Sequence, residues 1–315
     1  MKFEETIKNI KKLGGKFLTL YTLLVLGLLL ASCIPTSEPT QEAGPYGTTG
    51  VVLTLEPVKN TYYTVGNSIP FSFLLRIQNK GYHTLDSTDL SFTLTGFDQS
   101  IITGIPKTKQ ELQIVDEIIY GKRTFNSEGS TTLFPIEATS SFDDVGVDFE
   151  YDANFLLRYC YKYETLATAN VCVNTNTDMY DRGCIPETVL FSGGQGAPIE
   201  FISVTPLREG DGYSFNITLK NSGNGAVFPI NTDLESCKKL NALSEDYGHF
   251  SIKAYFSENE EAECLPSEPN IGQGIASVRC KFEGVSGQYQ RLLNLKAEYV
   301  YADSSNLPLV FRYFK

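Results

Sequence analysis

Few residues of this sequence have the types and spacing that catalysis requires. Nucleophilic catalysis needs a serine or cysteine together with a histidine base and a carboxylate that orients the histidine. The 315-residue chain has only two histidines, His83 and His249, and each lies beside a predicted turn. Asp86 follows His83 closely, but no G-x-S-x-G or comparable nucleophile motif accompanies them. We therefore predict no catalytic residues and a protein that is not an enzyme.

The sequence also gives little support for a bound metal or nucleotide. It contains no C-x-x-C pair for zinc, and the glycine-rich stretch 191–198 has no lysine and precedes a predicted strand. Acidic residues gather in 141–152 and 257–263, but neither stretch has the D-x-D-x-D-G spacing of a calcium loop. We predict no cofactor and no metal, and we favour solvated loop acids over a calcium site or the carboxylate pair of a glycosidase.

The cysteines carry a clearer chemical prediction. Six follow Cys33, and an even number in an exported chain indicates disulfides, although six cysteines allow many connectivities. If 164–168 forms a hairpin loop, Cys160 lies directly opposite Cys172, within disulfide reach. We predict that pair, which leaves Cys184 to bond across the linker or to remain free. The disulfide candidates are Cys160, Cys172, Cys184, Cys237, Cys264 and Cys280.

The N-terminal segment, residues 1–34, places these cysteines in an exported protein. A basic stretch precedes an uncharged apolar run that ends in Leu30-Ala31-Ser32-Cys33. This tetrapeptide resembles the lipobox of prokaryotic lipoprotein signals, a resemblance that implies lipid attachment at Cys33. The alternative is a retained single-span anchor. Both place the rest of the chain at the extracellular face of the cell membrane, and residues 35–49 form a flexible linker.

Three segments occur twice in the same order, which indicates an internal repeat. In each, apolar residues alternate with polar ones, as in a strand with one face on a core and one in water. The matched segments are 51–57 with 199–206, 71–81 with 213–223, and 151–164 with 289–302. The sequence predicts an all-β fold of two tandem immunoglobulin-like antiparallel β-sandwiches, 50–185 and 198–315, separated by a glycine-rich linker, 186–197.

The start of each copy resembles the CARDB-type, cell-adhesion-related immunoglobulin-like domains of bacterial and archaeal surface proteins. The shared pattern is a strand ending in proline, then G-D/N-x-x-x-F, an alternating strand and N-x-G. The matching residues are Gly66, Asn67, Phe73, Asn79 and Gly81, and then Gly210, Asp211, Phe215, Asn221 and Gly223. The resemblance implies roles in extracellular adhesion or spacing and no catalysis.

Charge and aromatic residues narrow the choice of partner. A net charge of −11 disfavours nucleic acid and anionic headgroups. The tyrosine ladders in 158–163 and 298–302 are expected to fill a core, the alternative being an exposed platform for a sugar. We predict a non-catalytic, membrane-tethered cell-surface protein, an adhesion, interaction or spacer module for an envelope or extracellular protein or glycan. The alternatives are a surface glycan-binding module, with or without calcium, and more remotely a β-sandwich hydrolase.

Overall fold

The computed structural model describes residues 46–112, 114, 118–123, 126–142, 147–175, 183–209, 212–239, 243–272 and 274–314. The chain divides into two units, 1–43 and 44–315, and only the second contains described residues. The predicted signal or anchor, the lipid site at Cys33 and most of the linker 35–49 therefore lie outside them, as do Gly210 and Asp211. In the part of the chain that is described, no helix is long and apolar enough to cross a membrane.

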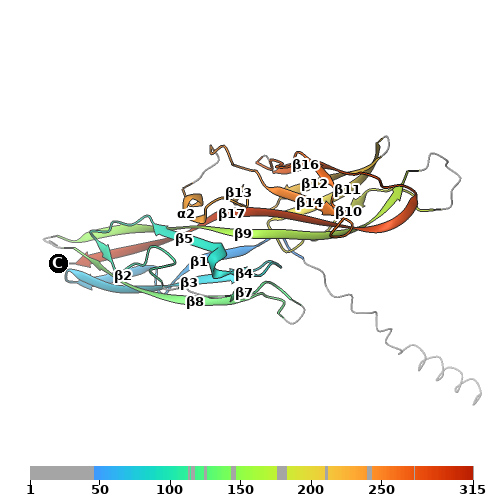
Figure 1. Cartoon of the computed structure of the whole chain (residues 1–315). Coiled ribbons are helices and arrows are strands. Elements are labelled where there is room, and N and C mark those ends of the chain that lie inside the picture. Colours follow the sequence, from blue (N-terminus) through green and yellow to red (C-terminus); the bar gives the residue numbers. More distant parts are fainter. Residues whose placement is uncertain are drawn as a thin grey trace, which may run out of the picture. The chain divides into compact units, whose positions relative to one another are not determined.

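The described chain is almost entirely β-structure (Figure 1). One outer sheet has the order β1 (Val51–Pro57), β3 (Ser68–Asn79), β8 (Thr131–Ser141), β6 (Ile102–Thr103). The second outer sheet has the order β10 (Val189–Leu190), β11 (Ile199–Glu209), β12 (Gly212–Asn221), β16 (Ile275–Phe282), β15 (Glu263–Leu265).

A third sheet is shared between the two halves of the chain. Its order is β13 (Ala226–Phe228), β17 (Gln288–Phe314), β9 (Phe149–Asn174), β5 (Leu90–Thr95), and β14 (Ser251–Tyr255) and β2 (Thr61–Val65) also pair with β17. The small elements are β4 (Leu85–Asp86), β7 (Ile118–Ile119), the 3-10 helix η1 (Ser87–Asp89) and the single-turn helix α2 (Leu234–Cys237). Most pairs are antiparallel, whereas β2 lies parallel to β17.

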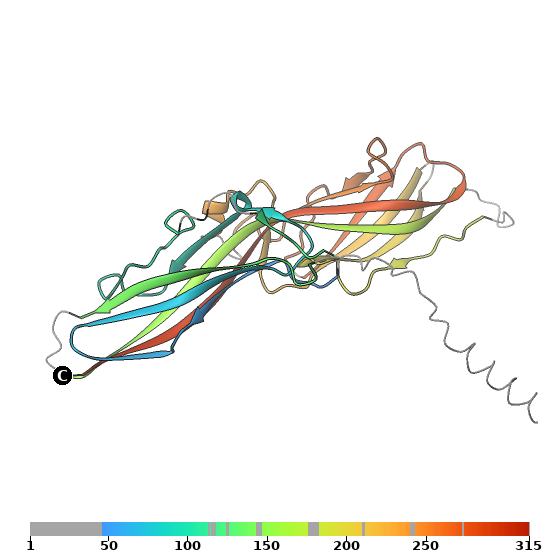
Figure 2. The same ribbon diagram turned by 90° about the horizontal axis from the view of Figure 1, so that it is seen from below.

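Strands β9 and β17 form one long ribbon, shown side by side in Figure 2. They pair antiparallel without interruption from Asn174 with Gln288 to Phe149 with Tyr313. Strand β9 contains no glycine or proline, and from Ala153 to Val173 its odd-numbered side chains face the cores. The predicted hairpin loop at 164–168 is therefore wrong. Thr165 is fully buried there, and its hydroxyl donates to the Ile199 carbonyl at 2.7 Å.

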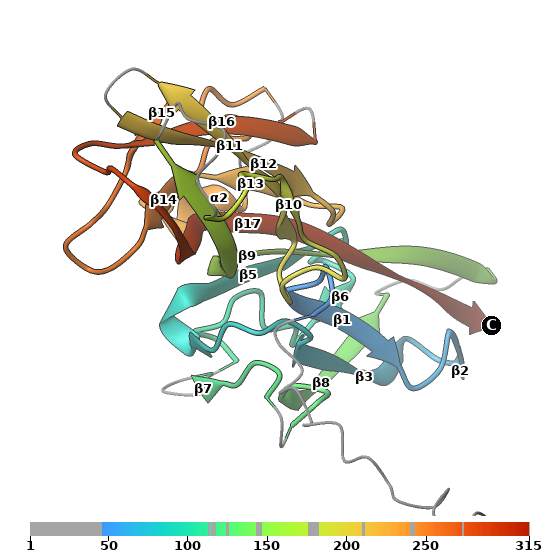
Figure 3. The ribbon, with the colours of Figure 1, turned by 90° about the vertical axis from the view of Figure 1, so that its right-hand side faces the viewer.

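Each outer sheet packs against a different length of this ribbon. Phe73 of β3 lies 5.4 Å from Phe155, ring centre to ring centre, and Tyr213 of β12 donates its hydroxyl to the Cys172 carbonyl at 2.9 Å. Figure 3 shows β1, β3 and β8 separated from β11, β12 and β16, with β9 and β17 between the two groups. The predicted all-β sandwich architecture is confirmed. One strand of the ribbon, β9, precedes the predicted linker 186–197 in the sequence and the other, β17, follows it, so each sandwich needs strands from both halves of the sequence.

All six disulfide candidates are paired, but the predicted Cys160–Cys172 bond is wrong. The bonds are Cys160–Cys237, Cys172–Cys184 and Cys264–Cys280. Because β9 does not turn back at 164–168, Cys160 and Cys172 lie far apart along one strand. Cys160 lies on the opposite face of β9 from the neighbouring tyrosines. That face is covered locally by a second small core of Cys160, Phe228, Cys237 and Val300.

Candidate interaction surface

The two copies of the repeat build the same hydrogen-bonded corner, which explains the N-x-G motif. In the first copy, Asn79 Oδ1 accepts the Gly81 N–H at 3.0 Å and the Tyr163 hydroxyl at 3.4 Å. In the second, Asn221 Oδ1 accepts the Gly223 N–H at 3.2 Å and the Tyr301 hydroxyl at 3.3 Å. Burial raises the pKa of both hydroxyls, so they stay protonated.

Both glycines of these corners are needed because a tyrosine hydroxyl occupies the place of a side chain. A Cβ added at Gly81 would lie 1.9 Å from the Tyr163 oxygen, and one at Gly223 would lie 2.1 Å from the Tyr301 oxygen. The N-x-G part of the pattern that resembles CARDB domains is therefore structural: it packs a tyrosine of the ribbon against the turn that follows an outer-sheet strand. The tyrosine ladders are core residues, as expected: Tyr161, Tyr163, Tyr299 and Tyr301 are all buried.

The histidine considered for catalysis takes part in an ion-pair network beside the first corner. His83 Nδ1 lies 3.1 Å from Glu164 Oε1, and Lys296 Nζ lies 2.8 Å from Glu164 Oε2. Hydrogen bonds from His83, and then from Lys296, lower the pKa of Glu164 to about 2 despite its partial burial. Among the described residues, His83 contacts Glu164, Tyr163 and Asn79, and these contacts fasten the β3–β4 loop to the ribbon.

The acidic stretches do not form a metal site among the described residues. Glu260 bonds to Arg291 and to the Ser257 hydroxyl, and these bonds lower its pKa. Asp143 and Asp144 lie outside the described residues, and across the remainder no group of three or more His, Cys, Asp or Glu side chains is arranged to hold a metal ion.

An exposed apolar surface surrounds β2 at the end of the ribbon. We define the β2 rim as Val58, Tyr63, Val65 and Phe314, whose exposed fractions are 63%, 60%, 81% and 40%. The Tyr63 and Phe314 rings stack with centroids 6.2 Å apart. The Arg312 guanidinium lies 5.9 Å from the centre of the Tyr63 ring and pairs with Glu150, so its charge is compensated.

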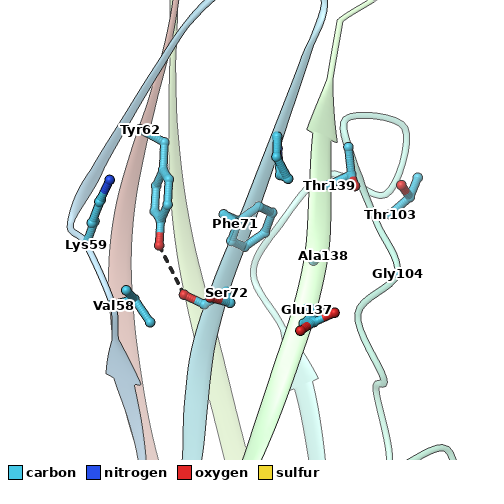
Figure 4. A pocket seen from close by; sticks show the side chains of 11 residues that line it. Val58, Lys59, Tyr62, Phe71, Ser72, Thr103, Gly104, Glu137, Ala138 and Thr139 are labelled. Carbon is cyan, nitrogen blue, oxygen red and sulfur yellow. Dashed lines mark hydrogen bonds between the residues drawn. The ribbon is translucent and has the colours of Figure 1, made fainter.

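A pocket of about 560 Å³ adjoins the β2 rim. In Figure 4, Val58, Lys59 and Tyr62 stand on one side of β3, and Glu137, Thr139 and Thr103 stand on the other. The Tyr62 hydroxyl donates to the Ser72 carbonyl at 3.0 Å, on the stretch of β3 beyond the end of its pairing with β1. The pocket combines hydroxyl groups with one ammonium group and one carboxylate, so it suits a polar ligand or side chain.

No protein-family model matches the chain, and no curated protein matches it in sequence. The CARDB resemblance thus remains a prediction. Sequence reasoning also missed the β2 rim, since residues 61–65 favour a strand by type but do not show which side of that strand stays unpaired.

Proposed function

We propose that this chain is a non-catalytic, membrane-tethered cell-surface protein that works by recognition, as an adhesion, interaction or spacer module. The observation that carries the proposal is the β2 rim: four exposed apolar side chains gather beside a polar pocket at one end of a continuous ribbon. Exposed aromatic residues next to a pocket are typical of protein-recognition surfaces.

The scaffold supports such a role. A continuous 26-residue strand, β9, packs against both outer sheets, and the Cys160–Cys237 and Cys172–Cys184 bonds fasten α2 and the segment after β9 to it. A surface at the end of this ribbon therefore rests on a cross-linked scaffold. Disulfides persist in oxidising compartments, which agrees with an extracellular location. In this proposal the two sandwiches act as immunoglobulin-like modules of the CARDB type, and the lipobox-like Cys33 anchors them to the membrane through lipid.

The location is tested by fractionating cells that express the chain and its Cys33→Ser variant. We expect the parent protein in the membrane fraction, accessible to an added protease in intact cells, with a mature N-terminus at a lipid-modified Cys33. The variant should keep residues 1–32. A parent protein that is cytosolic, or protected from protease in intact cells, would contradict the proposal.

Recognition is tested by capturing partners from envelope extracts with the purified chain. The variant Tyr63→Ala/Phe314→Ala removes the stacked pair of the β2 rim. Tyr120→Ala is a matched control, because Tyr120 is 55% exposed and lies directly after β7, outside the β2 rim. We expect the double variant to lose the captured partner and the control to retain it. Equal capture by all three proteins would place recognition elsewhere on the molecule.

Glycan binding is a second candidate, favoured by the pocket rather than by the tyrosine ladders. Thr103, Thr139 and Glu137 present oxygen atoms that suit sugar hydroxyl groups. Of the residues that line this pocket, only Glu137 carries a carboxylate, so the carboxylate pair of a glycosidase is lacking there. Glycan-array binding that Glu137→Gln abolishes would support this function, and binding lost on chelation would add calcium to it.

A further inference from the structure

Strand β2 has a free edge. It pairs in parallel with β17 from Thr61 opposite Val310 to Val65 opposite Phe314, and the Val310 N–H donates to the Asn60 carbonyl at 3.0 Å. Because main-chain groups alternate in direction along a strand, Tyr62 and Thr64 bond to β17, and the main chains of Thr61, Tyr63 and Val65 point the other way. Within the described residues, no main-chain hydrogen bond reaches Tyr63 or Val65 from that side.

The other long margins of the shared sheet are covered. The Leu94 N–H of β5 donates to the Lys107 carbonyl at 2.9 Å, and the Ala254 carbonyl of β14 accepts the Ala262 N–H at 2.8 Å. Exposed edges are usually protected by charges, proline or bulges, because an unprotected edge is a template for another strand. Strand β2, with the sequence TYYTV, has none of these features.

We propose that a second copy of this chain pairs antiparallel with β2, around a two-fold axis at Tyr63. This inference deepens the proposed function, because it names the partner of the β2 rim. Tyr63 then exchanges both main-chain hydrogen bonds with Tyr63 of the second copy, and Thr61 lies opposite Val65 on each side. Such a pairing adds about six main-chain hydrogen bonds and continues the shared sheet through both copies.

The side chains around β2 fit this symmetric contact. Reversing the strand sets Tyr63 against its own copy and sets Thr61 against Val65, which are aromatic and β-branched pairs favoured between antiparallel strands. The two stacked pairs of Tyr63 and Phe314 then form a row of four aromatic rings across the axis.

Charge favours a second copy over an acidic or basic peptide. Two chains with a net charge of −11 repel each other, and a two-fold contact sets any charge near its axis against the same charge of the second copy. Residues 60–75 contain no charged side chain, and the nearby Arg312 is paired with Glu150. The β2 edge is thus a neutral place on an acidic molecule, where two copies can approach closely.

The test is sedimentation equilibrium of the purified full-length chain over about a hundredfold range of concentration. We expect a reversible monomer–dimer equilibrium, and Tyr63→Lys/Val65→Lys should weaken it at least about tenfold, because four like charges then meet at the axis. Tyr120→Lys is the matched control and should dimerise like the parent. Thermal unfolding of each variant shows whether it is folded.

A cysteine at the axis provides an independent readout. Residues directly opposite in a hydrogen-bonded antiparallel pair have Cα atoms about 5.5 Å apart, within disulfide reach. Tyr63→Cys should therefore form a covalent dimer under mild oxidation, and Tyr120→Cys should not. A chain that stays monomeric, or a dimer that Tyr63→Lys/Val65→Lys leaves intact, would overturn the inference. A monomer that still captures an envelope protein through the β2 rim would overturn the dimer and leave the proposed function standing.

Discussion

The two N-x-G corners should respond differently to the same pair of substitutions. At Gly223, an added Cβ meets the Tyr301 hydroxyl oxygen at 2.1 Å, and the next neighbours, in Pro198 and the Tyr301 ring, are 3.0 Å away. At Gly81, the Tyr163 oxygen lies at 1.9 Å, but the main-chain carbonyl oxygens of Gly196 and Thr49 follow at 2.4 and 2.8 Å. A tyrosine hydroxyl can be removed by substitution, whereas a carbonyl oxygen cannot.

The magnitudes follow from these distances. Inserting a methyl group into a filled site costs about 1–3 kcal/mol, and neither glycine has the left-handed φ that would add backbone strain. Tyr301→Phe alone should cost about 1 kcal/mol, because the Gly225 N–H loses its acceptor at 2.8 Å. In the Tyr301→Phe protein, Gly223→Ala should cost less than about 1 kcal/mol. In the Tyr163→Phe protein, Gly81→Ala should keep most of its cost.

The assay is urea unfolding of the four single and two double variants, analysed as two double-mutant cycles. We expect a coupling free energy of about 1–2 kcal/mol between Gly223 and Tyr301 and much less between Gly81 and Tyr163. The Gly81/Tyr163 cycle is the control for the Gly223/Tyr301 cycle, because the same two substitutions are made at both corners. If Gly223→Ala costs the same with and without the Tyr301 hydroxyl, close approach of that hydroxyl does not explain the glycine.

The remaining predictions concern protonation and cross-links. The pKa of Glu164 is lowered to about 2, so the stabilisation from its ion pairs is present above about pH 4.5 and is lost as the pH falls toward 2. Urea unfolding as a function of pH should show that the free energy of unfolding falls by at most about 3 kcal/mol across this range. The Glu164→Gln variant should not show this decrease. Identical pH profiles of the two proteins would contradict the ion-pair network. Non-reducing peptide mapping should find Cys160 joined to Cys237, and a Cys160–Cys172 peptide would refute the fold of β9. Replacing both Cys160 and Cys237 by alanine, which opens a link across 77 residues, should lower the free energy of unfolding by about 2–4 kcal/mol, whereas no change would show that the bond is dispensable.

The amino-acid sequence alone determined the kind of structure and many of its buried residues. Alternation of apolar and polar residues predicts strands, and it correctly assigned the tyrosines of β9 and β17 to the core. The repeated N-x-G turns were also recognisable, because short-range turn chemistry depends on adjacent residues. The six cysteines indicated disulfides, and all six are bonded.

Long-range packing, which no local pattern of residues reveals, determines which strands and which cysteines meet. Alternation shows which face of a strand is buried but not where the strand ends or what lies beside it, so 164–168 was mistaken for a turn in the middle of β9. The partner of Cys160 is Cys237, brought there by the placement of α2 on the outer face of the ribbon. The free edge of β2 depends in the same way on long-range pairing with β17, because an edge is defined by the neighbour that a strand lacks.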